Sequence, residues 1–249
     1  MEKTWHGFLM KEFLFEGYEA VLVLPKQPLL GGCIVLKTEY WDAFPDVERR
    51  LVEAGLYLAY IKNRTRFATK DDCDRKARFV YYLSKTYGLN PKCILIGMSC
   101  GGAHAVRFAG FYPELVQCVY LDAPVLNYSS FPGKVGVLGC EQVWQGEFLV
   151  AYPGVSRWQL LSFQEHPLCM AEILIKHRIP ILLVWGTDDR LVPYEENGWL
   201  LEEACTGFDQ LTVICVQNRG HHPHGMAREQ DNQQIVDYLL CHSAASNAV

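Results

Sequence analysis

The sequence predicts an α/β fold, in which a mostly parallel sheet follows an antiparallel hairpin and carries helices on both faces. Short apolar runs rich in β-branched residues recur along the chain, as is typical of strands. From about residue 32 onward these runs alternate with amphipathic helical patterns. Continuous apolar strands that are joined by helices form parallel sheets with both faces covered. Residues 126–179 break this alternation, because they carry helical patterns and no clear strand.

The first half of the chain begins with a hairpin over residues 12–25, which turns at Glu16-Gly17. The pattern then predicts a strand over 32–37, a helix over 46–55, a strand over 56–62 and a long helix over 69–88. Thr69 and Asp72 resemble a capping box in which Asp replaces Glu, and Gly88 ends this helix.

The second half continues the alternation. The expected strands are 93–97, 116–124, 179–186 and 211–217, and the expected helices are 101–113, 195–207 and 233–242. Within 126–179 the helical patterns cover 140–152, 156–163 and 168–177. A connection this long is commonly functional in a compact fold. We therefore expect a helical lid inserted at 126–179 into a core formed by 1–125 and 180–249.

The composition excludes several classes of function. The 249 residues suit one large domain, and a net charge of -5 without a basic block argues against a nucleic-acid partner. The N-terminus lacks the features of a signal peptide, and no apolar stretch is long enough to cross a membrane. The ten cysteines form no C-x-x-C pair, and several stand in apolar runs, so we expect reduced thiols. These features predict a cytoplasmic protein without a membrane partner, and they leave the oligomeric state, a homodimer included, open.

A candidate nucleophile stands between a predicted strand and a predicted helix. In the stretch "GMSCGG", a glycine stands two residues before Ser99 and two glycines follow Cys100. A G-x-S-x-G elbow places its serine on a strained strand-to-helix turn. The amide of Cys100 would then point from the helix N-terminus toward a developing oxyanion. The motif alone also fits a glycine-rich helix start, but its position between strand and helix favours a nucleophile.

A nucleophilic serine needs a base and an orienting carboxylate. Asp188 and Asp189 both follow the strand 179–186, at the edge where open α/β sheets place their sites. Asp189 fits the spacing G-x-x-D-x-x-V-P, so we favour it. An Asx turn or a helix cap is the alternative role for either residue. Asp122, at the end of an earlier strand, is a third candidate.

The candidate base lies after the last strand, in "NRGHHPHGM". His221 follows Gly220 directly, and Pro223 biases His222 toward an extended conformation. We therefore assign His221 as the base, with His222 and His224 as pocket or hydrogen-bonding residues. The H-H-x-H spacing lacks a helical i, i+4 pair, so it does not favour a metal site, and we expect no cofactor.

The order Ser99, Asp189, His221 is the nucleophile, acid and base order of α/β-hydrolases. Each residue follows its own strand, so the chain resembles the α/β-hydrolase superfamily over nearly its full length, with 126–179 as a helical cap. The stretches "LKTEYWDAFP" and "GHHPHG" resemble small bacterial serine esterases. The resemblance implies an α/β-hydrolase fold and hydrolysis of a small carboxylic ester, with a short-acyl or polar group such as a sugar or aryl moiety. A peptidase similar to prolyl oligopeptidases, or a non-catalytic binding protein on this scaffold, is the alternative.

The chain departs from many relatives after the third strand. They carry His-Gly, where a backbone amide completes the oxyanion hole, whereas this chain has Lys37-Thr38-Glu39-Tyr40. By position the amide of Glu39, or that of Tyr40, is the second donor. A carboxylate or a phenol there favours polar substrates. We name Tyr40, Trp144 and Trp158 as substrate-binding candidates, although most aromatic residues of the lid are expected to pack it onto the core. The stretch 62–66, "KNRTR", suits an anionic substrate group, but a solvated loop is the favoured interpretation.

Overall fold

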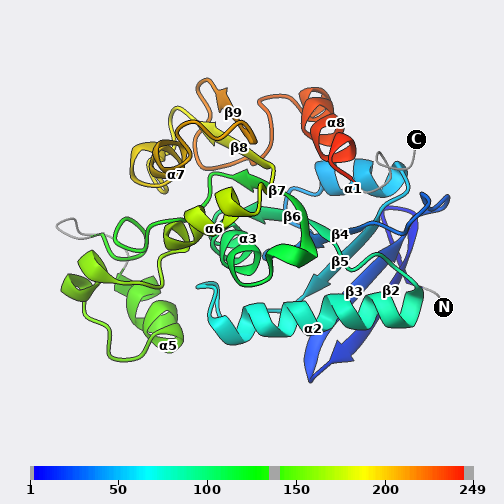
Figure 1. Ribbon diagram of the computed structural model, residues 1–249, viewed down its shortest axis with the longest axis horizontal. Helices are drawn as coiled ribbons and strands as arrows, with labels where there is room; N and C mark the ends of the chain where they lie inside the picture. Colours follow the sequence, from blue (N-terminus) through cyan, green and yellow to red (C-terminus); the bar gives the residue numbers. More distant parts are fainter. Residues whose placement is uncertain (1–2, 135–140, 244–249) are drawn as a thin grey trace.

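The computed structural model describes residues 3–134 and 141–243, and its centre is one twisted sheet (Figure 1). The strand order is β1-β2-β3-β5-β4-β6-β7-β8-β9. The strands are β1 (Lys3–Trp5), β2 (Phe8–Phe15), β3 (Tyr18–Leu24), β4 (Ile34–Lys37), β5 (Tyr57–Ile61), β6 (Cys93–Met98), β7 (Val116–Asp122), β8 (Ile181–Gly186) and β9 (Leu211–Val216).

The sheet is parallel from β5 to β9 and antiparallel from β1 to β3, with β3 antiparallel to β5. The predicted hairpin is confirmed: Glu16 and Gly17 have φ of 51° and 83°, as a tight two-residue hairpin turn requires. Strand β1 was not predicted. It pairs with β2 through a similar turn, in which His6 and Gly7 have φ of 46° and 82°. Three residues are too few to show an alternating pattern.

The larger helices follow the expected ranges. They are α1 (Asp46–Glu53), α2 (Lys70–Tyr87), α3 (Cys100–Phe111), α7 (Gly198–Ala204) and α8 (Gln233–Cys241), with short 3-10 turns η1 (Pro113–Leu115), η5 (Tyr194–Glu196) and η6 (Glu229–Asn232). The start and end of α2 are confirmed. The Thr69 hydroxyl accepts the N–H of Asp72 at 3.3 Å, and Gly88 has φ of 70°. In the part of the chain that the structure describes, no helix has the length and apolar composition needed to cross a membrane.

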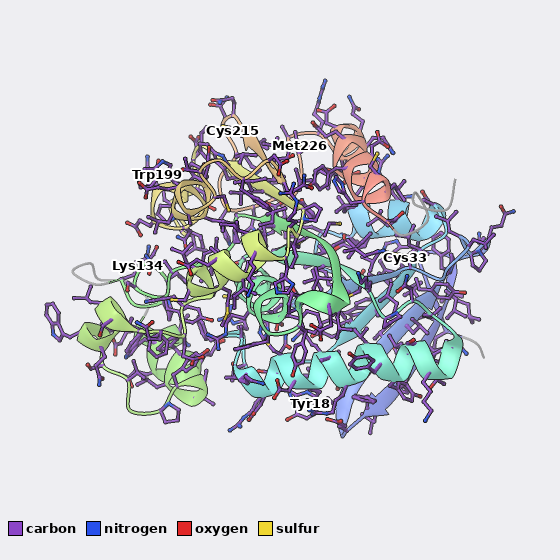
Figure 2. All side chains as sticks on the ribbon, in the orientation of Figure 1. Tyr18, Cys33, Lys134, Trp199, Cys215 and Met226 are labelled. Carbon is purple, nitrogen blue, oxygen red and sulfur yellow. The ribbon has the colours of Figure 1, made fainter. Side chains whose placement is uncertain are left out.

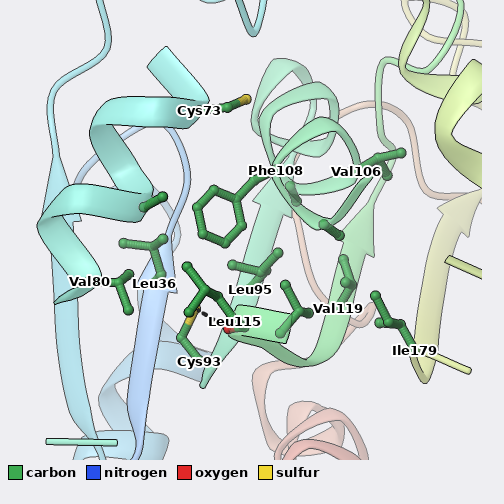
Figure 3. Close-up of a cluster of buried hydrophobic side chains, with 14 of the residues drawn as sticks. Leu36, Cys73, Val80, Cys93, Leu95, Val106, Phe108, Leu115, Val119 and Ile179 are labelled. Atoms are coloured by element: carbon green, nitrogen blue, oxygen red, sulfur yellow. Dashed lines mark hydrogen bonds between the residues drawn. The ribbon is translucent and has the colours of Figure 1, made fainter. Parts of the chain in front are cut away.

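Two hydrophobic layers hold the helices on the sheet. Helices α1 and α8 pack on one face, and α2, α3 and α7 pack on the other. Side chains fill the space between the sheet and these helices (Figure 2). Figure 3 shows Phe108 of α3 among residues of α2 and of the central strands. In the same layer the Cys93 thiol donates to the carbonyl of Leu115 at 3.3 Å, which shows a cysteine packed as part of the core.

The described residues between β7 and β8 contain helices and turns but no strand. These are α4 (Glu141–Val143), a π-helical turn η2 (Trp144–Phe148), α5 (Leu149–Ala151), η3 (Arg157–Ser162), η4 (Pro167–Met170) and α6 (Ala171–Lys176). The elements from 141 to 163 lie at the end of the molecule farthest from β2 and β3 (Figure 1). Helix α6 instead packs on α3, and its Ala171 and Leu174 belong to the core layer of α2 and α3.

Trp144 is a structural residue of this helical segment. Its side chain is 3% exposed, stacks on Phe148 with ring centroids 4.7 Å apart, and lies under the guanidinium of Arg157. We expect Trp144→Ala to lower the free energy of unfolding by about 3–5 kcal/mol, the usual cost of removing a buried aromatic ring. Trp158 is 75% exposed, so Trp158→Ala is the matched control and should change stability by less than about 0.5 kcal/mol. Urea denaturation followed by circular dichroism tests both, and equal losses would contradict this packing.

Candidate active site

Ser99 forms the sharp turn that joins β6 to α3. Its backbone has φ of 51° and ψ of -123°, a region that residues with a side chain rarely occupy. The surrounding backbone holds it there, because its N–H donates to the carbonyl of Asp122 at 3.0 Å and its carbonyl accepts the N–H of Val125 at 2.9 Å. A strained backbone of this kind persists only where surrounding contacts hold it in place. Such a strained turn is characteristic of a nucleophile elbow.

The glycines around Ser99 are required by close packing. A Cβ on Gly97 would lie 2.7 Å from the carbonyl oxygen of Gly101. A Cβ on Gly102 would lie 2.3 Å from the Cβ of Pro124. Both distances are shorter than non-bonded carbon and oxygen atoms tolerate, so the turn that presents Ser99 needs these two residues without side chains.

A continuous chain of hydrogen bonds joins the three residues that sequence reasoning favoured. His221 Nε2 lies 3.0 Å from Ser99 Oγ, and His221 Nδ1 lies 2.7 Å from Asp189 Oδ2. The other oxygen of Asp189 accepts the N–H groups of Leu191 and Val192 at 3.0 and 2.9 Å. Because a carboxylate only accepts, it fixes the imidazole proton on Nδ1 and leaves Nε2 to accept the proton of the serine hydroxyl.

The environment of Asp189 keeps its carboxylate ionised. Burial raises the pKa of this carboxyl, but the hydrogen bonds from His221 and Val192 outweigh burial and hold the pKa below its ordinary value. Asp188, in contrast, is exposed, and its carboxylate meets only the hydroxyl of Thr187 among the hydrogen bonds of the described residues. The structure therefore brings Asp189, and not Asp188, to the histidine.

The third acid candidate, Asp122, serves a different histidine. It is fully buried at the end of β7, and its carboxylate lies 3.1 Å from His224 Nδ1. It also accepts the N–H of Gly225 at 2.5 Å and the hydroxyl of Tyr120 at 2.7 Å, with the Arg219 guanidinium 2.9 Å away. Asp122 thus fixes the loop that carries the histidines, and it does not contact the histidine that meets Ser99.

The three histidines are close together but have different partners. The rings of His221 and His224 meet edge to face with centroids 5.2 Å apart, while His222 stacks on Phe44. Within residues 3–134 and 141–243, no group of three histidine, cysteine or carboxylate side chains is arranged to hold a metal ion. The absence of a metal requirement stays a prediction.

Two backbone amides, those of Cys100 and Glu39, are the expected oxyanion donors and lie beside the first turn of α3. Cys100 is the first residue of α3, so its N–H has no acceptor inside the helix. The backbone nitrogen of Glu39 lies 3.5 Å from where a Cβ on Gly101 would stand, beside the same helix turn. The N–H of Tyr40 instead donates to the carboxylate of Glu39 at 3.2 Å. This geometry favours the amide of Glu39 over that of Tyr40 as the second donor.

A polar network, in which Lys76 and His104 are buried, holds the Glu39 segment in place. The Asn63 amide donates to the carbonyl of Thr38 at 2.7 Å and to the carboxylate of Glu39, and it accepts from the ammonium of Lys76. The same ammonium lies 3.2 Å from His104 Nδ1. Sequence reasoning named Asn63 only as part of the loop 62–66. It did not name Lys76, because a lysine in an amphipathic helix gives no local sign that it is buried.

Lys37 is the last residue of β4 and begins the stretch that departs from the expected His-Gly. Its side chain is 2% exposed, forms an ion pair with Glu48 of α1, and donates to the carbonyl of Ala43 at 3.1 Å. The lysine therefore ties the loop after β4 to α1, which fixes the backbone that presents Glu39.

Ser99 opens into a cavity of about 200 Å³, here called the Ser99 cavity. Its described lining residues are Tyr40, Ala43, Phe44, Arg66, Met98, Ser99, Cys100, Phe131, Leu191, His221, His222 and His224. Tyr40 thus lies where sequence reasoning placed it. The Glu39 side chain lines a neighbouring cavity instead, and Arg66 lines both.

Two of the expected substrate-binding residues do not line the Ser99 cavity. Trp144 points into the hydrophobic cluster of its own helical segment, and Trp158 points to solvent. The aromatic walls come from Phe44 and Phe131 instead. Both lie in loops, where no periodicity indicates which way a side chain points.

Solved structures of other proteins resemble this chain in fold, although their sequences are only distantly similar. No protein-family model and no curated protein sequence matches the chain. Among solved structures, an S-formylglutathione hydrolase from Agrobacterium tumefaciens aligns over 97% of each chain with a TM-score of 0.63 and 17% identity. A monoacylglycerol lipase from Paleococcus ferrophilus aligns over 91% of this chain and 99% of its own, with a TM-score of 0.61 and 17% identity.

A larger protein shares the same architecture. An acylaminoacyl peptidase from Pyrococcus horikoshii aligns over 94% of this chain with a TM-score of 0.72 and 11% identity, and this chain spans 41% of its length. The expected fold is confirmed by these likenesses together with the strand order and the helices on both faces. The chain has the α/β-hydrolase fold.

Proposed function

We propose that the chain is a serine hydrolase that cleaves carboxylic esters through an acyl-enzyme intermediate. The observation that carries the proposal is the unbroken hydrogen-bond chain from Asp189 through His221 to Ser99. A protein that had kept the scaffold for binding alone would have no need to hold all three groups in this geometry. The intermediate would form and break down in two steps.

In the first step, Ser99 Oγ attacks the ester carbonyl carbon while His221 Nε2 takes the hydroxyl proton. The carbonyl oxygen becomes an oxyanion, which the amides of Cys100 and Glu39 stabilise. The bond from carbon to the alcohol oxygen then breaks, and His221 gives its proton to the departing alcohol. Throughout this step the carboxylate of Asp189 stabilises the imidazolium and holds its orientation.

In the second step, water takes the place of the alcohol. His221 Nε2 accepts a proton from the water as its oxygen attacks the acyl carbon, and the same two amides hold the second oxyanion. The bond between Ser99 Oγ and the acyl carbon breaks, and His221 returns a proton to the serine. The acid product leaves and the serine is restored.

The Ser99 cavity supports a small substrate. Its volume of about 200 Å³ lies below the range typical of pockets for drug-sized ligands. Phe44 and Phe131 present apolar rings, and Tyr40 and Arg66 present polar groups. A short-acyl or small polar ester fits this lining better than a long-chain one. In this proposal the segment 126–179 acts as a lid, since its Phe131 forms part of the wall and its Glu147 binds Arg66.

A peptidase is the second candidate, and the likeness to the acylaminoacyl peptidase is the observation that favours it. Turnover of 4-nitrophenyl acetate and butyrate against the matching 4-nitroanilides separates the two. We expect the esters to be hydrolysed, with activity falling for a dodecanoyl ester, and the anilides to remain intact. Faster cleavage of the anilides would favour a peptidase. No cleavage of either, with no acyl adduct in the intact mass, would favour a binding protein.

A further inference from the structure

Arg66 gives the Ser99 cavity a fixed positive charge. Among the described residues that line this cavity, it is the one side chain that stays charged at every ordinary pH, and none is a carboxylate. Asp189 and Asp122 are buried outside the lining. A negatively charged group that enters the cavity therefore meets a cation and no opposing anion on its walls.

A carboxylate on the helical segment orients this arginine. Arg66 Nε lies 2.5 Å from Glu147 Oε2, and Arg66 Nη2 lies 2.5 Å from Glu147 Oε1. This bidentate arrangement fixes the plane of the guanidinium. Glu147 lines the neighbouring cavity of about 230 Å³ and does not line the Ser99 cavity. The carboxylate therefore occupies one edge of the guanidinium and is not part of the described lining of the Ser99 cavity.

The opposite edge of the guanidinium faces Tyr40. Arg66 Nη1 lies 3.3 Å from the Tyr40 hydroxyl oxygen, and both side chains line the Ser99 cavity. Burial, with the neighbouring Cys100 thiol, raises the pKa of Tyr40, so the phenol stays protonated and neutral. A guanidinium has five N–H groups. Nε, Nη2 and Nη1 each engage one partner here, so two N–H groups remain for a ligand.

We propose that Arg66 and the Tyr40 hydroxyl form a carboxylate-binding subsite of the Ser99 cavity, and that the preferred substrate is a small ester carrying a free carboxylate. This inference rests on the proposed ester hydrolysis. The shared cavity places the anion and the scissile ester within one small molecule of each other. The competing explanation is that Arg66 and Glu147 only fasten the helical segment to the core.

Matched pairs of esters test the subsite. Monomethyl glutarate carries a carboxylate on the acyl side where methyl pentanoate has a methyl group. 3-Acetoxypropanoate carries one on the alcohol side where propyl acetate has a methyl group. We expect wild-type kcat/KM to favour the acidic ester in one pair. In Arg66→Gln the ratio of acidic to neutral kcat/KM should fall at least about tenfold, the effect of losing a charge-assisted hydrogen bond. In Glu147→Gln the ratio should hold or rise, because the competing carboxylate is gone.

Arg64→Gln is the control. Arg64 stands on the same loop as Arg66 but lines the neighbouring cavity and not the Ser99 cavity. This substitution removes the same charge and should leave the ratio unchanged. If Arg66→Gln and Glu147→Gln both lower turnover of acidic and neutral esters alike, the pair only fastens the segment and the subsite is overturned. Wild-type hydrolysis without any preference overturns the subsite but not the hydrolase, whereas no hydrolysis of any ester overturns the proposed function.

A measurement on the wild-type protein keeps the subsite testable should Arg66→Gln not fold. Glutarate should inhibit hydrolysis of methyl pentanoate competitively, and glutaramide, which lacks the charges, should inhibit at least about tenfold more weakly. Equal inhibition by the two compounds would overturn the subsite.

Discussion

Replacing Ser99 with alanine should lower kcat for a short-chain ester by a factor on the order of 10⁶, as loss of a triad nucleophile does in a well-studied protease. Alanine keeps the Cβ and the backbone bonds to Asp122 and Val125, so the fold should be unchanged. The backbone amides of Cys100 and Glu39, the proposed oxyanion donors, are unchanged and can still polarise a bound ester, so only residual catalysis should remain.

Steady-state hydrolysis of 4-nitrophenyl acetate measures this loss, and circular dichroism checks the fold. Ser162→Ala is the control, because Ser162 is exposed on η3, outside the lining of the Ser99 cavity. It should keep wild-type kcat. If Ser99→Ala keeps more than a tenth of wild-type activity, the reacting nucleophile is another residue.

Replacing Asp189 with asparagine should lower kcat by about 10⁴-fold, because an amide can donate to His221 Nδ1 and so favours the wrong tautomer. The side chain keeps its size, so the loss should appear in kcat and not in the free energy of unfolding. Asp188→Asn is the matched control one residue away, and its exposed carboxylate has no contact with the histidine.

The comparison of kcat between these two variants decides the acid. A small change for Asp188→Asn beside a large loss for Asp189→Asn is the expected result. The reverse ranking would place the orienting carboxylate at Asp188, and equal small losses would mean that His221 needs no carboxylate partner.

Most of the fold was predictable because strands and helices leave a periodic signal. The apolar runs that became β4 to β9 and the capped helix α2 were read directly from that signal. Strand β1 was missed because three residues carry no period, and only its pairing with β2 makes it a strand. The π-helical turn at Trp144–Phe148 could not be predicted from the sequence either. A wider helical turn of this kind depends on how the segment packs and leaves no mark in the composition.

The site was predictable where its residues follow strands. Ser99, Asp189 and His221 each follow a predicted strand, and parallel strands bring their carboxyl ends to one edge of the sheet. Asn63 and Lys76 were not predictable, since their roles depend on a network that only the folded chain assembles. For Arg66, the sequence favours a solvated loop over the binding of an anionic group, because the contacts of Arg66 with Glu147 and Tyr40 form only in the folded chain.

The most direct test of the Ser99 nucleophile is covalent labelling of the full chain with a fluorophosphonate, followed by intact mass and peptide mapping. We expect one phosphonyl group per chain, located on Ser99, and no adduct on Ser99→Ala under the same conditions. The adduct should form because Ser99 Oγ attacks phosphorus as His221 takes its proton, with fluoride leaving. A wild-type protein that gains no adduct, or one labelled on another residue such as Cys100, would contradict the assignment of Ser99 as the nucleophile.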